Sequence, residues 1–133
     1  MIKRRIERGL ETIISKKEDK VTIKIKHEMS ISIIEKAMEK AIDNTLNEMV
    51  KCKEVEAINN LAILREQQHR ILSIALNNTG HNNIIISLID IEVLHKALSE
   101  YKTILTSEIK KSNNIDELCD KMFYCNKLLS QIA

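Results

Sequence analysis

The chain has 133 residues, with 21 Lys/Arg against 19 Asp/Glu, so its formal net charge is only +2. A charge this small excludes the large basic excess typical of nucleic-acid-binding domains. The chain contains no proline and two glycines, and 44% of its residues are hydrophobic. Because proline and glycine are the residues that most disfavour helices, this composition predicts an all-α fold. We expect one helical domain over residues 1–133, an antiparallel bundle of four or five helices.

The N-terminal segment is expected to form an amphipathic helix with a basic face. Isoleucine and leucine recur every three to four residues between Ile2 and Ile14, which is the period of a helix with one apolar side. That face is a candidate nucleic-acid contact, the alternative being an ordinary solvated helix face. Its cations are Lys3, Arg4, Arg5 and Arg8.

The period changes after the first helix. Apolar and polar residues alternate from Val21 to Lys26, which predicts a short extended segment at 21–26, either a connection or a strand of a larger sheet. We therefore divide the domain into a basic N-terminal helix with an extended connection (1–28) and a helical bundle core (29–133).

A long helix is predicted to begin at a capping box formed by Ser32 and Glu35, with an apolar stripe that continues to Val50. The next helical pattern, residues 55–76, either continues that helix or follows a jog at 51–53. Its apolar residues lie on two sides. This pattern indicates either a surface available for docking or a well-buried central helix.

Two further helices are predicted in the C-terminal half. The Asn-rich run 77–83 is predicted to be a loop, because Asn and Gly tolerate left-handed backbone angles. The strongest helical stripe of the chain then runs from Ile84 to Ile109. A last helix follows Ser112–Asn114, with Asp116 and Glu117 in its first turn, where carboxylates favour the positive end of the helix dipole.

No sequence motif indicates an enzyme. Phosphate-binding glycine patterns and nucleophile motifs are absent from the sequence, so we expect no catalytic residue, no cofactor and no metal site. One alternative is a carboxylate–histidine metal-binding bundle, because Glu66 and His69, like Glu92 and His95, have the i, i+3 spacing of di-iron bundle ligands. The carboxylates that should bridge such a metal pair are not evident.

The remaining features are typical of a cytoplasmic protein. The N-terminus lacks the apolar region of a secretory signal, and no stretch reaches the roughly 20 apolar residues that span a bilayer, so we expect no membrane association. Cys52, Cys119 and Cys125 are odd in number and lack Cys-x-x-Cys spacing, which favours free thiols.

Three segments occur in the order seen in a known helical domain. Residues 64–72 are similar to a helix opening with an Asn/Arg-x-Arg-His pattern, and residues 92–100 to a Glu-x-Leu-Arg-x-Ala helix. Residues 115–123 are similar to a Leu-Asp-x-Ile-Phe segment that precedes a terminal Phe-Cys-Ile-Gly-Lys. In these segments the chain resembles the C-terminal helical part of MnmE/TrmE-type tRNA-modification GTPases. Cys125 would then correspond to the family cysteine.

The resemblance implies a C-terminal tail, either a remnant or separately encoded, with a docking role in wobble-uridine modification of tRNA. The phosphate loop and switch residues of that family are missing from the sequence, so this chain alone should not hydrolyse GTP. The residues themselves favour a different function, a non-enzymatic helical interaction or assembly module. We expect a protein partner or self-association, with RNA as a further partner only if the basic N-terminus binds it.

Overall fold

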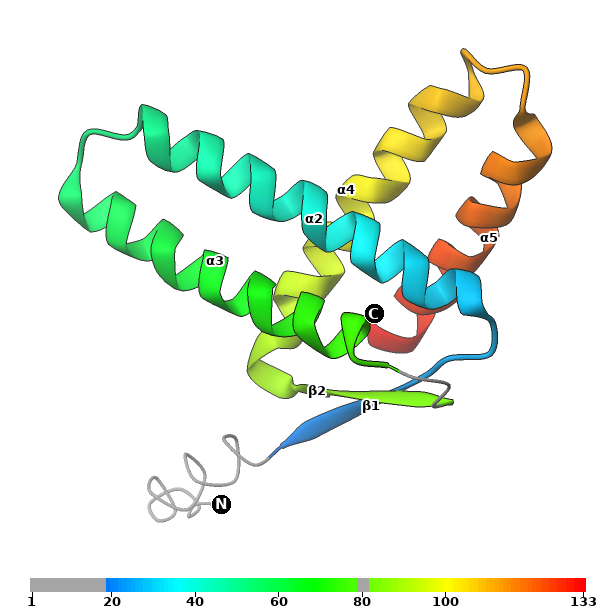
Figure 1. The fold of residues 1–133 in the computed structure, drawn as a ribbon, viewed down its shortest axis with the longest axis horizontal. Coiled ribbons are helices and arrows are strands. Elements are labelled where there is room, and N and C mark those ends of the chain that lie inside the picture. The colour runs from blue at the N-terminus through cyan, green and yellow to red at the C-terminus, as the bar shows by residue number, and fades with distance from the viewer. Residues whose placement is uncertain (1–18, 79–81) are drawn as a thin grey trace.

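The structure, a computed structural model, describes residues 19–78 and 82–133. In this described part, four α-helices and one two-stranded sheet follow in the order β1, α2, α3, β2, α4, α5 (Figure 1). The prediction of an all-α bundle with a short extended segment is therefore confirmed. The predicted first helix and its basic face lie outside the described residues.

The extended segment predicted at 21–26 is one strand of a small antiparallel sheet. Strand β1 (Lys20–Lys24) pairs with β2 (Asn83–Ser87), and Ile23 lies opposite Ile84. Both isoleucines are buried, because alternate residues of each strand face the helices. This sheet lies at the base of the molecule and covers one end of the helical core (Figure 1).

The prediction that a helical stripe begins at Ile84 is wrong. Within β2, Ile84 and Ile86 are buried whereas Ile85 is 55% exposed, a period of two. Helix α4 (Ile91–Ile109) begins only after a short 3₁₀ turn at Leu88–Asp90. An unbroken run of apolar residues fits a helix and a buried strand equally well, and here the pairing with β1 decides between them.

The predicted capping box at Ser32 and Glu35 is also wrong. Helix α2 (Glu28–Lys51) begins one turn earlier, because the Nδ1 atom of His27 accepts a hydrogen bond from the Met29 N–H at 3.0 Å. His27 has an extended backbone (φ −151°, ψ 145°), as expected of the residue that caps a helix. Ser32 therefore lies inside the helix.

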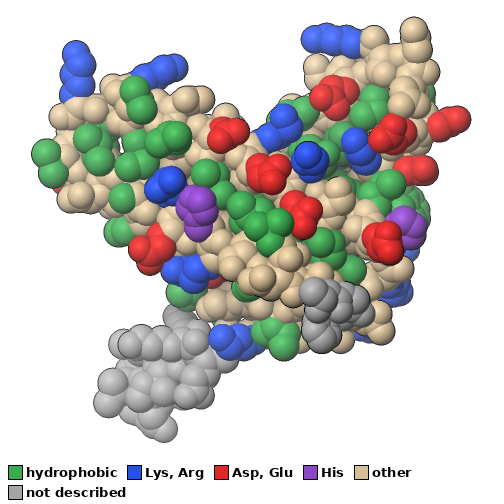
Figure 2. Space-filling view, in the orientation of Figure 1, with side chains coloured by type: hydrophobic (Ala, Val, Ile, Leu, Met, Phe, Trp, Pro, Cys, Tyr) green, Lys and Arg blue, Asp and Glu red, His purple; other side chains and the backbone are tan. Residues whose placement is uncertain are grey.

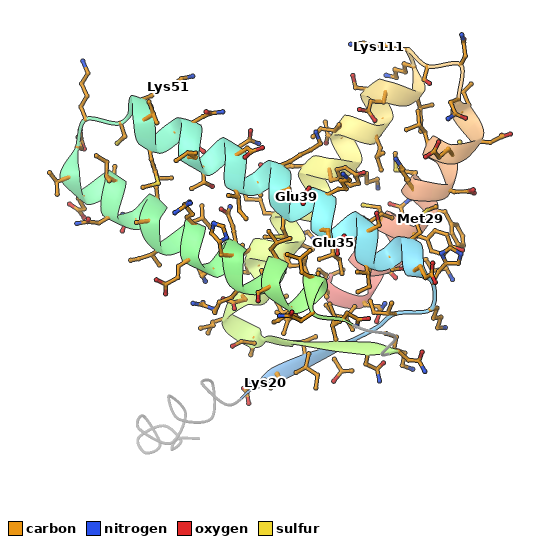
Figure 3. All side chains as sticks on the ribbon, viewed as in Figure 1. Lys20, Met29, Glu35, Glu39, Lys51 and Lys111 are labelled. Atoms are coloured by element: carbon orange, nitrogen blue, oxygen red, sulfur yellow. The ribbon has the colours of Figure 1, made fainter. Side chains whose placement is uncertain are left out.

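The helices form two hairpins. Helix α2 ends at Lys51 and α3 (Val55–Leu76) runs back along it, so the alternative of a single continuous helix is excluded. Helices α4 and α5 (Ile115–Ile132) form the second hairpin. The hairpins diverge from the sheet, and their free ends are marked by Lys51 and Lys111 (Figures 1 and 3).

The core lies where α2 packs against the other three helices, and the sheet closes it by contacts of β2 with α3 and of β1 with α5. It is almost entirely aliphatic, and Tyr101 is its one buried aromatic residue in the described part of the chain. The fully buried large side chains include Ile33, Ile34, Met38, Ile71, Leu94, Leu98, Leu105, Leu128, Ile23 and Ile86.

Candidate functional site

The free end of the α2–α3 hairpin, residues 46–67, is the least covered part of the described structure. None of these residues is buried, although α2 buries eight residues before position 46 and α3 buries three from Gln68 onwards. We call this segment the hairpin end. It consists of two helices that α4 borders only across a cleft and that the 3₁₀ turn contacts at Gln67. Two helices alone cannot enclose an aliphatic core.

Large aliphatic side chains of the hairpin end are in contact with solvent. Leu46 is 46% exposed, Val50 78%, Val55 74% and Ile63 62%. Hydrophobic side chains accordingly lie on the surface over this hairpin (Figure 2). Leu46 and Val50 continue the apolar stripe that the sequence predicts for this helix, but this end of the stripe is exposed. The stripe continues beyond the point where α4 and α5 diverge from α2, so no neighbour remains to cover it.

The two-sided apolar pattern of residues 55–76 has a structural explanation. One side of α3 packs on α2 and buries Ile71 and Ala75, whereas Val55, Ile63 and Leu76 remain exposed. The alternative of a well-buried central helix is therefore excluded.

Charges of both signs surround the exposed aliphatic residues. The hairpin end carries the acids Glu48, Glu54, Glu56 and Glu66 and the bases Lys51, Lys53 and Arg65. The four acids and three bases leave a net charge of only −1, which is too small to repel a second copy strongly.

A polar cluster fixes the base of α3 to the start of α4. The Asp90 carboxylate, 3% exposed, accepts hydrogen bonds from Arg70 Nε at 3.1 Å and Arg70 Nη2 at 2.9 Å. Gln67 Nε2 donates to the same carboxylate at 3.2 Å and to the Ile89 carbonyl at 3.3 Å. The hydrogen bonds between Arg70 and Asp90 raise the pKa of Arg70 above its ordinary value. This bidentate interaction between Arg70 and Asp90 fixes the position of α3 relative to the start of α4.

A cleft of about 380 Å³ lies between α2, α3 and α4, next to the hairpin end. The space-filling view shows the molecule hollowed between the two hairpins (Figure 2). Lys51, Lys96 and Glu100 line the cleft together with Gln68, whose side chain is almost fully buried. The Oε1 atom of Gln68 has no hydrogen-bond donor among the described residues. An unpaired buried acceptor is unusual, because it loses its hydrogen bonds to water without replacement.

Cys125, the counterpart of the family cysteine in the resemblance, is a core residue. Its side chain is buried, and its Sγ donates to the Leu98 carbonyl at 3.5 Å. Burial raises the pKa of Cys125 from 9.0 to about 11. The thiol therefore stays protonated at neutral pH and is a poor nucleophile. Cys52 and Cys119 are also free thiols; Cys52 is partly buried, whereas Cys119 is exposed.

Lys3, Arg4, Arg5 and Arg8 lie outside the described residues. The two predicted Glu-His pairs do not form a cluster in the described part of the chain. Glu66 and His69 are exposed on α3, where Glu66 forms an ion pair with Arg70 at 3.5 Å. On α4, Glu92 is exposed and His95 is half-buried.

Residues 19–78 and 82–133 contain no group of three or more His, Cys, Asp or Glu side chains that could hold a metal ion. In the same ranges, no helix is both long enough and apolar enough to cross a membrane.

Comparison of the chain with protein-family models, with curated proteins and with solved structures gives no match. The resemblance to tRNA-modification GTPases therefore stays a prediction.

Proposed function

We propose that the chain is a non-enzymatic assembly module in which the hairpin ends of two copies pack against each other. The observation that carries this proposal is the exposure of Leu46, Val50, Val55 and Ile63 on a hairpin segment with no buried residue. Two such hairpins placed side by side form a four-helix arrangement, in which each copy supplies the helices that the other lacks.

The exposed area supports an interaction of moderate strength. Burying a fully exposed aliphatic side chain contributes about 2 kcal/mol to the free energy of association. The four side chains are about half to three-quarters exposed, so covering them contributes roughly 5 kcal/mol per copy. Two copies contribute roughly 10 kcal/mol, and the loss of translational and rotational freedom costs about 4 kcal/mol or more. The difference corresponds to a dissociation constant of roughly tens of micromolar or weaker.

The mixed charges and the cleft also favour a second copy as the partner. The hairpin end carries four acids and three bases, so it offers groups of either sign to a second copy. The cleft beside it holds the unpaired Oε1 of Gln68, which a donor from the second copy would satisfy.

Light scattering after size-exclusion chromatography tests the proposal. We expect the mass of the native chain to rise from monomer to dimer as the concentration increases from about 10 µM to about 1 mM. Val50→Ser combined with Ile63→Ser should keep the chain monomeric over this range, because both side chains are exposed and the fold does not depend on them.

Ile115→Ser is the matched control. Ile115 is also an exposed aliphatic helix residue, 48% exposed, but it lies at the end of the other hairpin. This variant should dimerise like the native chain. A native chain that stays monomeric at the highest concentration would contradict the proposal, and so would an equal loss of dimer in the Ile115 control.

A further inference from the structure

A second surface, distant from the hairpin end, has the chemistry of a ligand site. A pocket of about 520 Å³ lies where β1 and the connection after it meet the start of α2 and the C-terminal half of α5. Met29 marks the start of α2 beside this region (Figure 3). The volume is in the range of pockets that hold small organic ligands.

The charged groups that the pocket offers are all cationic. Lys24, Lys26 and Lys127 line it, and none of the described lining residues is acidic. A lysine ammonium has hydrogen-bond donors and no acceptor, so these groups select an anion. The side chain of Gln131 is already in use, because its amide accepts from the Lys24 N–H at 2.8 Å and donates to the Lys24 carbonyl at 3.0 Å.

The same hydrogen bonds give the pocket a fixed wall. Lys24 belongs to β1 and Gln131 to the last turns of α5, so the two bonds join elements that are 107 residues apart in the chain. The cations of the pocket are therefore carried by segments held together at this point, and the site does not depend on a flexible loop.

Aromatic rings gather at the same pocket, although rings are scarce in this chain, which has one phenylalanine and two tyrosines. Phe123 and Tyr124 both line it and contact each other edge to face, with ring centroids 5.1 Å apart. His27 stacks on Tyr124 at 4.7 Å with an interplanar angle of 21°. Phe123 is 54% exposed, and the Lys127 ammonium lies 5.3 Å from its centroid.

An exposed ring in a pocket lined by three lysines, one with its ammonium over that ring, suits a ligand that combines a planar aromatic ring with an anionic group. The ring of the ligand can stack on Phe123, and lysines supply point charges to phosphate oxygens. We infer that this pocket binds a phosphate-bearing nucleoside, with the phosphate held by Lys26 and Lys127 and the base stacked on Phe123. Either a free nucleotide or a unit of a single-stranded nucleic acid carries this chemistry.

Titration of the ¹⁵N-labelled chain with adenosine monophosphate, followed by NMR, tests the inference. We expect saturable shifts of the amide signals of Lys26, Phe123, Tyr124 and Lys127. Lys127→Ala should weaken binding about tenfold, because it removes one charge-assisted contact. The control Lys110→Ala removes the same charge at the end of α4, outside the pocket, and should leave the affinity unchanged.

Two further probes separate the parts of the ligand. Phe123→Leu keeps an apolar side chain and loses the ring. This variant should therefore bind adenosine monophosphate more weakly and bind inorganic phosphate with unchanged affinity. Adenosine without phosphate should bind far more weakly than the monophosphate. Equal affinity for adenosine and the monophosphate would overturn the inference. The absence of shifts in the native chain would also overturn it, and so would an equal loss of affinity in the Lys110→Ala control.

The source of the ligand follows from one comparison. An oligoadenylate RNA that binds more tightly than the monophosphate, with the same loss in Lys127→Ala, identifies a nucleic-acid strand. Equal affinities identify the free nucleotide. Binding to phosphatidylserine vesicles that the monophosphate does not displace would assign these lysines to a lipid surface and contradict the inference.

Discussion

Replacing Asp90 with asparagine tests how the two hairpins are held together. The carboxylate is 3% exposed and accepts two hydrogen bonds from Arg70 and one from Gln67. Asp90→Asn preserves the shape of the side chain but removes its negative charge. The new NH₂ group is a donor that faces an Arg70 donor, so one hydrogen bond is lost. A hydrogen bond to a charged group contributes about 1.5–3 kcal/mol. Because Arg70 is 45% exposed, solvent screening reduces this value, and we expect a loss of about 2 kcal/mol.

Urea denaturation followed by circular dichroism measures this loss, which corresponds to a fall in Tm of about 7 °C for a domain of this size. Arg70→Gln and the double variant complete a thermodynamic cycle, in which we expect a coupling energy of about 1–2 kcal/mol. Glu66→Gln is the control, since Glu66 contacts the same arginine from an exposed position at 3.5 Å and its loss should not be measurable. A coupling energy near zero would refute the account of Asp90 as a structural clamp.

Three other predictions follow from single residues. His27→Ala should lower stability by about 1 kcal/mol because the N-cap acceptor is lost, whereas His27→Asn should restore most of it; equal denaturation midpoints would contradict this. At pH 8, iodoacetamide should modify the exposed Cys119 and leave Cys125 unmodified until the chain unfolds. Burial raises the pKa of Cys125 to about 11, so its thiol is still protonated at this pH. Mass spectrometry of native and unfolded samples measures the modification, and modified Cys125 in the native sample would contradict the prediction. Gln68→Met should leave the monomer as stable or more stable, because it removes an unpaired buried acceptor, and a clear loss of stability would show that the acceptor has a partner within the fold.

The helical architecture was predictable from the sequence because it depends on local features. The absence of proline, the Asn-rich connections and the period of the apolar residues all predict helices, and α5 lies where Asp116 and Glu117 placed its start. The strand β2 was missed for the opposite reason. Ile84, Ile85 and Ile86 are all apolar, so their alternate burial exists only through pairing with β1, which is distant in the sequence.

The candidate surfaces were less predictable still. The sequence showed that residues 55–76 are apolar on two sides, and the choice between a buried and an exposed helix required the position of α4. The aliphatic stripe of α2 runs unbroken to Val50, and nothing in its period shows where the covering helices diverge. The basic pocket joins Lys24 and Lys26 to Phe123 and Lys127, residues about a hundred positions apart, which only the folded chain brings together.

Hydrogen exchange of the backbone amides at low and high protein concentration tests self-association most directly. The hairpin end, residues 46–67, has no buried residue in the single chain, so its amides should exchange early at low concentration. At high concentration we expect slower exchange confined to residues 46–67, and no such change in Val50→Ser combined with Ile63→Ser. Exchange that is independent of concentration, or slowed only on α4 and α5, would contradict the proposed assembly.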